Sequence, residues 1–143
     1  MFNSNLIHPI VVHFPIALII VGFFTDFLYL IIKKDKSLSR TGLYLMVLAA
    51  LSAVVAWISG EFFTVHPSEG EILQVFQKHE TAAFITMLIM VTGAALRIYL
   101  AIIKKEGSRL KWIVFALYLL AFASVGFTGM MGGEMVYNFM IGI

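Results

Sequence analysis

The sequence predicts an all-α integral membrane protein, a four-helix bundle whose helices run alternately up and down. Apolar residues make up 61% of the 143-residue chain and charged residues only 13%, whereas about a quarter of a soluble domain is charged. The mean hydropathy is +0.97, and four apolar stretches each reach the length of about 20 residues that crosses a bilayer. Because backbone polar groups in lipid must be paired within the protein, we expect these stretches to be helices.

The four expected spans cover about residues 14–32, 41–59, 81–103 and 112–130, within one transmembrane domain. The first span has no positive segment before it and no small-residue cleavage site after it, so it does not resemble a cleaved signal. Short connections make neighbouring helices antiparallel. The outer connection, residues 60–80, includes the start of EILQVFQKHETAAF, whose apolar spacing predicts an amphipathic helix that continues into the third span.

Two prolines shape the start of the first span. Pro9 is suited to the first position of a helix, with His8 just before it. Pro15 either kinks that helix, because it lacks a backbone donor, or begins the regular helix itself. Under both alternatives, rigid local backbone holds His13 at the edge of the hydrocarbon.

Basic residues set the expected orientation. They gather between the first and second spans and between the third and fourth: Lys33, Lys34, Lys36, Arg40, Lys104, Lys105, Arg109 and Lys111. Positive connections face the cytoplasm, so we expect a bacterial inner-membrane protein with both termini on the periplasmic side. All four histidines, His8, His13, His66 and His79, then lie at the outer face.

The gathering of the histidines predicts a ligand site at that face. Neutral imidazole binds haem iron, zinc or copper, and the first and third spans would lie diagonally across the bundle. We therefore expect His13 and His79 to be the axial ligands of one haem b, with His8 as the substitute for His13. We expect four further side chains near these ligands, and some of them would accept a hydrogen bond from the second ring nitrogen of a histidine. They are Glu134, Glu80, Glu61 and Tyr137. The chain has no cysteine, which excludes covalent c-type haem attachment.

Asp26 and Arg97 are charges inside spans, each about 10 Å from the cytoplasmic boundary. Such charges are costly in lipid, so an ion pair between them is expected. The alternatives are that Arg97 extends to the interface, or that the two residues serve a proton path or a quinone contact. The interval from His8 to Asp26 equals that from His79 to Arg97 and is about five helical turns. Each histidine would then share a helix face with one charge, unless a kink at Pro15 intervenes.

One line of the third span is expected to face the bundle interior: His79, Thr86, Met90, Gly93 and Arg97. In the C-terminal stretch, Gly129 and Gly133 form a GxxxG pattern that permits close helix approach, so a homo-oligomer stays open. Gly132 and Gly133 are expected to end the last helix and to return Glu134 and Tyr137 to the histidine face.

Four motifs resemble those of the domain of unknown function 2231 family: IHPIVVHFPIAL, SGE, KHE and TGMMGGEMVY. This family consists of small bacterial four-span membrane proteins. Some relatives occur fused or adjacent to cytochrome c or iron–sulfur modules, so the resemblance implies an electron-transfer or haem-related role. Relatives often continue GG-x-LVY-x-HG, and Phe139 stands where that histidine would be. The resemblance therefore implies one haem, or fewer ligands, rather than two haems.

The first hypothesis is a haem b-binding electron-transfer subunit that connects a membrane quinol pool with an external carrier. Its partners would be membrane lipid and other membrane or periplasmic redox subunits. A bundle of this size has little room for a substrate pocket, so a redox subunit is favoured over an independent enzyme. The net charge of +2 comes from residues that flank the spans, so nucleic-acid binding is not expected.

Two alternatives remain open. One is a cofactor-free structural or assembly subunit whose histidines only cap and anchor helices. The other is a copper, zinc or iron site built from His8, His13, His79 and a carboxylate such as Glu61 or Glu134. The chain has no HExxH motif and no paired Glu-x-x-His motif, so a standard zinc hydrolase or helical di-iron site lacks its usual signature.

Overall fold

The computed structural model describes residues 7–32, 35–64 and 66–139. The helices in these ranges are α1 (Ile7–Val11), α2 (His13–Ile32), α3 (Lys36–Phe63), α4 (Glu71–Ile102) and α5 (Leu110–Phe139). α1 and α2 together form the first membrane-length segment, so the structure has four segments long and apolar enough to span a bilayer. The expected all-α architecture is confirmed.

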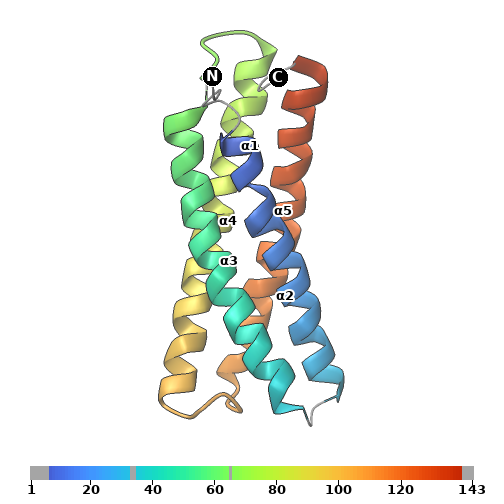
Figure 1. Cartoon of the computed structure of the whole chain (residues 1–143), viewed down its shortest axis with the longest axis vertical. Helices are drawn as coiled ribbons and strands as arrows, with labels where there is room; N and C mark the ends of the chain where they lie inside the picture. The colour runs from blue at the N-terminus through green and yellow to red at the C-terminus, as the bar shows by residue number, and fades with distance from the viewer. Residues whose placement is uncertain (1–6, 33–34, 65, 140–143) are drawn as a thin grey trace.

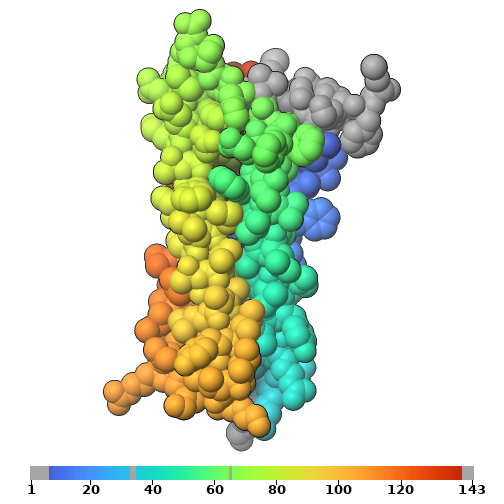
Figure 2. Space-filling model, turned by 90° about the vertical axis from the view of Figure 1, so that its left-hand side faces the viewer, coloured from blue at the N-terminus to red at the C-terminus, as the bar shows by residue number. Residues whose placement is uncertain are grey.

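The helices α2 to α5 form a ring in which each contacts its two neighbours (Figure 1). α2 packs against α3 and α5, and α4 packs against the same two helices, so α2 and α4 lie on one diagonal. Figure 2 shows α3 and α4 side by side along one face of the molecule. We call the end that holds α1 and the α3–α4 connection the histidine end.

The first segment breaks at Val12, between α1 and α2. Pro15 has no N–H for the carbonyl of Val11, and its ring crowds that carbonyl, which lies one turn earlier. The chain nevertheless continues in the same direction, because the N–H of Val12 donates to the carbonyl of His8 at 3.1 Å. The break lets α1 lean onto α3, with which it is in contact.

At the histidine end, α3 extends further than the expected span and continues to Phe63. α4 begins at Glu71, as the amphipathic stretch predicted, so the connection without helix is much shorter than residues 60–80. The prediction that Gly132 and Gly133 end the last helix is wrong, because α5 continues to Phe139. A helical glycine costs only about 1 kcal/mol, and Met135, beyond the two glycines, packs in a small core.

The main core lies along the centre of the ring. Its fully buried large side chains are Ile19, Met46, Met90, Leu100 and Tyr118. Large apolar side chains on the outward faces are about half exposed, among them Phe24, Leu48, Leu88 and Leu120. Contiguous exposed apolar surface on all four segments suits contact with lipid tails and not with water.

Gly22 marks a close approach of α2 to α5. A Cβ atom at this position would lie 1.8 Å from Tyr118 Oη and 3.1 Å from Leu45 Cβ. Since Tyr118 is fully buried, we expect Gly22→Ala to lower the free energy of unfolding by about 1–3 kcal/mol. Adding Tyr118→Phe, which removes the crowded oxygen, should recover part of the loss.

Thermal unfolding of the detergent-solubilised protein measures this effect. Gly126→Ala is the matched control, because among the described residues no atom outside its own stretch of helix lies within 4 Å of a Cβ added at Gly126. It should be neutral or raise stability by up to about 1 kcal/mol through helix propensity. Equal effects of the two substitutions would contradict the packing argument.

Candidate functional site

Polar side chains form contacts between helices at two levels of the bundle. At the end opposite the histidines, both guanidinium nitrogens Nη1 and Nη2 of Arg97 donate to the carboxylate of Asp26, the Nη2 contact being 2.8 Å. Nη2 also donates to the carbonyl of Ser39 at 3.0 Å. Gly42 makes room for this pair, since a Cβ atom there would lie 2.0 Å from Asp26 Oδ1. The structure thus brings together the two intramembrane charges in a buried, bidentate contact.

A cavity of about 50 Å³ lies beside the ion pair. Its lining includes Asp26, Arg97, Tyr29, Glu106 and Lys111. A space of this size is large enough for a water molecule.

His79, on α4, is half-buried at the histidine end and turned toward α5. Its Nδ1 lies 3.0 Å from the carbonyl oxygen of Thr128. Gly132 lies beside the ring, where a Cβ atom would be 3.4 Å from His79 Cε1. Because a carbonyl oxygen only accepts, Nδ1 of His79 carries the proton and Nε2 keeps its lone pair.

A polar network joins α4 to α5 one to two turns from His79. The hydroxyl of Thr86 lies 2.6 Å from that of Ser124 and 3.4 Å from that of Thr128. It donates to the carbonyl of Ala82 as well. Thr86 and Met90 are buried, as the inward line of the third span predicted.

His8, on α1, is half-buried and contacts α3. Its Nδ1 lies 2.8 Å from Ser59 Oγ, and that hydroxyl donates its single proton to the carbonyl of Ala56. Ser59 Oγ therefore accepts from Nδ1 of His8, and Nε2 of His8 keeps its lone pair. Gly60 lets the ring approach α3, since a Cβ atom there would be 3.1 Å from His8 Cε1.

His13 takes a different position: it is exposed, and its Nδ1 lies 2.6 Å from the carbonyl of Pro9 in its own segment. A helix turns about 100° per residue, so the step from His8 to His13 carries the ring about 140° around the axis. The structure therefore turns His8, and not the expected His13, toward the helix partners at the histidine end.

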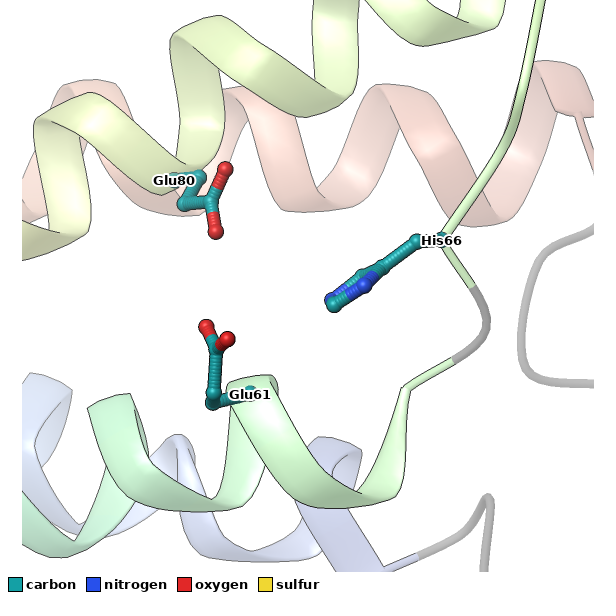
Figure 3. A group of neighbouring side chains, drawn as sticks. All are labelled: Glu61, His66 and Glu80. Carbon is teal, nitrogen blue, oxygen red and sulfur yellow. The ribbon is translucent and has the colours of Figure 1, made fainter.

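The carboxylates expected around the histidines are placed differently. Glu61 and Glu80 are exposed and lie close to His66, with all their ligand atoms within 4.8 Å of one another (Figure 3). Glu134 is half-buried on α5, and Tyr137 is 86% exposed. Among the described residues, the hydrogen bonds of His8 and His79 go instead to Ser59 and Thr128.

Sequence reasoning did not identify Ser59 and Thr128 as partners. Ser59 belongs to the SGE motif at the end of the second span, and Thr128 lies in the glycine-rich stretch of the last. Both residue types are common in membrane helices, where they bond to their own backbone. A histidine partner on another helix has no local signal in the sequence.

Four membrane-length helices around a buried polar diagonal define a polytopic helical membrane protein. The chain belongs to the family described as "Predicted membrane protein (DUF2231)", whose model matches residues 5–143. This agrees with the resemblance of its motifs. No curated protein and no solved structure matches the chain.

Proposed function

We propose that the protein is a membrane redox subunit that would bind one haem b at the histidine end, with His79 and His8 as the residues that would hold its iron. One observation carries the proposal. Both half-buried imidazoles use Nδ1 as a hydrogen-bond donor and keep the Nε2 lone pair. Metal-bound histidines have this arrangement, because the bond at the second nitrogen holds the tautomer and the ring orientation.

The donor set suits haem iron. Two neutral imidazoles come from α1 and α4, which belong to the first and third membrane-length segments, and haem b takes histidine ligands without a covalent link. Gly60 and Gly132, which lie beside the two rings, keep bulky side chains away from them. A haem held there would supply reversible one-electron transfer, while the protein sets its orientation and surroundings.

Sidedness follows from the charge distribution. The basic connections lie at the end opposite the histidines, so by the preference of positive residues for the cytoplasm the histidine end would face the periplasm. The exposed apolar faces would contact lipid. From that position the subunit would exchange electrons between a membrane quinol pool and an external carrier, in a complex with other redox subunits.

The direct test is a reduced-minus-oxidised absorption spectrum of the detergent-purified protein, together with a pyridine haemochrome assay. We expect a b-type spectrum and close to one haem per chain. The protein is purified from cells grown with ample iron and haem precursor, so that a shortage of haem in the cell cannot explain a colourless sample. A colourless protein would refute the proposal and favour a cofactor-free packing subunit, in which His8–Ser59 and His79–Thr128 only join helices.

His8 and His13 provide a matched pair of variants. His8→Ala should remove one of the two imidazoles that would hold the iron and convert a low-spin spectrum to a high-spin one. His13→Ala should leave the spectrum unchanged, because His13 is exposed and bonded within its own segment. The opposite result would restore His13 as the ligand and remove His8.

A further inference from the structure

Three metal-binding side chains converge at the histidine end, outside the bundle. Glu61 lies in the last turn of α3, His66 in the α3–α4 connection and Glu80 on α4. Figure 3 shows the two carboxylates facing each other across a gap, with the imidazole of His66 pointing into it. Their ligand atoms lie within 4.8 Å of one another, and all three side chains are exposed.

Local structure holds His66 near the two helices. The following Pro67 restricts the backbone of His66 to extended conformations. The imidazole packs edge-on against the ring of Phe76, with 5.1 Å between the ring centroids. Phe76 is itself buried between α4 and α5, so a rigid part of the bundle positions the imidazole.

The charges at this place are unbalanced. Glu61 and Glu80 bring two carboxylates together, and like charges at this separation repel. Among residues 7–32, 35–64 and 66–139, the single ion pair is that of Arg97 with Asp26. In the described part of the chain, therefore, no basic side chain forms an ion pair with Glu61 or Glu80, and a cation in the gap would relieve their repulsion.

We propose that Glu61, His66 and Glu80 bind a divalent transition-metal ion, with Zn²⁺ as the best match. Zinc takes imidazole nitrogen and carboxylate oxygen at about 2.0–2.2 Å, and a water completes a tetrahedron. Such a tetrahedron places its ligand atoms about 3.3 Å apart, which exposed side chains reach by small rotations. Magnesium and calcium prefer all-oxygen sites, so the imidazole disfavours them.

Bound zinc would fasten the end of α3 to α4 across their connection. The ligands are exposed, so the ion would exchange with the medium on that side of the membrane. This site shares no ligand with the proposed haem site, and each proposal stands or fails without the other.

The test is isothermal titration of the chelator-treated, full-length protein in detergent with ZnCl₂. We expect one saturable site per chain. Glu61→Gln, Glu80→Gln and His66→Ala should each weaken binding about tenfold or more. Glu69→Gln and Glu71→Gln are matched controls, because both carboxylates are exposed in the same region but lie outside the cluster.

Zinc should also raise the midpoint of thermal unfolding of the native protein, because an ion that binds only the folded state stabilises it. The rise should be absent in His66→Ala and present in His79→Ala. Three results would overturn the proposal: no saturable binding, equal losses in Glu61→Gln and Glu69→Gln, or a site abolished by His79→Ala and unaffected by His66→Ala. The last would transfer zinc to the inward histidines.

Discussion

Arg97→Ala is expected to lower the free energy of unfolding by about 3–5 kcal/mol, because it leaves the carboxylate of Asp26 buried without its partner. The substitution also removes the donor to the Ser39 carbonyl. The side chains of Asp26 and Arg97 are only 9% and 10% exposed, so bulk water solvates the remaining carboxylate poorly even with the small cavity beside it. The pair also joins two helices that are not neighbours in the ring.

Unfolding by SDS or heat in detergent micelles measures the loss. Arg109→Ala is the control, because Arg109 is an exposed arginine in the α4–α5 connection; its effect should stay within about 0.5 kcal/mol. The double variant Asp26→Leu/Arg97→Met replaces both charges by apolar groups of similar volume and should recover most of the stability. If Arg97→Ala matched Arg109→Ala, the pair would contribute nothing to the fold.

His79→Ala is expected to abolish the low-spin b-type spectrum. His79 lies on a long helix of the bundle, and its ring is oriented by the Thr128 carbonyl on a neighbouring helix. Without this imidazole, only His8, on the short helix α1, would remain to hold the iron. We expect haem content to fall to a small fraction of that of the unsubstituted protein.

Added imidazole distinguishes a lost ligand from a damaged fold. If the cavity left by His79→Ala stays intact, free imidazole should restore part of the low-spin spectrum. His66→Ala is the control histidine variant, because His66 is exposed and lies with Glu61 and Glu80; its spectrum should not change. An unaltered spectrum in His79→Ala would remove His79 from the site.

Much of the architecture follows from local sequence. The inward line of the third span is confirmed at Thr86, Met90 and Arg97, which are all buried. The amphipathic start of that span also forms a helix, from Glu71 onward. Hydropathy and helical period are properties of a few consecutive helical turns. They can therefore be determined from the sequence without knowing which helices pack together.

Predictions that depended on helix ends were less successful. Gly132 and Gly133 favour the end of a helix, yet α5 continues through them because Met135 packs against α4. The same lengthening of helices at the histidine end shortens the α3–α4 connection and leaves Glu61 and Glu80 facing each other. Tertiary contacts outweigh a helix-propensity cost of about 1 kcal/mol.

By itself, the sequence determined that four helices are long and apolar enough to cross a membrane and that every histidine lies toward one end of the bundle. Only the tertiary structure decided that His8, and not His13, turns inward and that His66 joins two carboxylates. The reason is physical: the side chains that meet these histidines, Ser59 at His8 and Glu61 and Glu80 at His66, lie on other helices. Their distance from the histidines is set by helix packing and by the break before Pro15, which composition and periodicity do not encode.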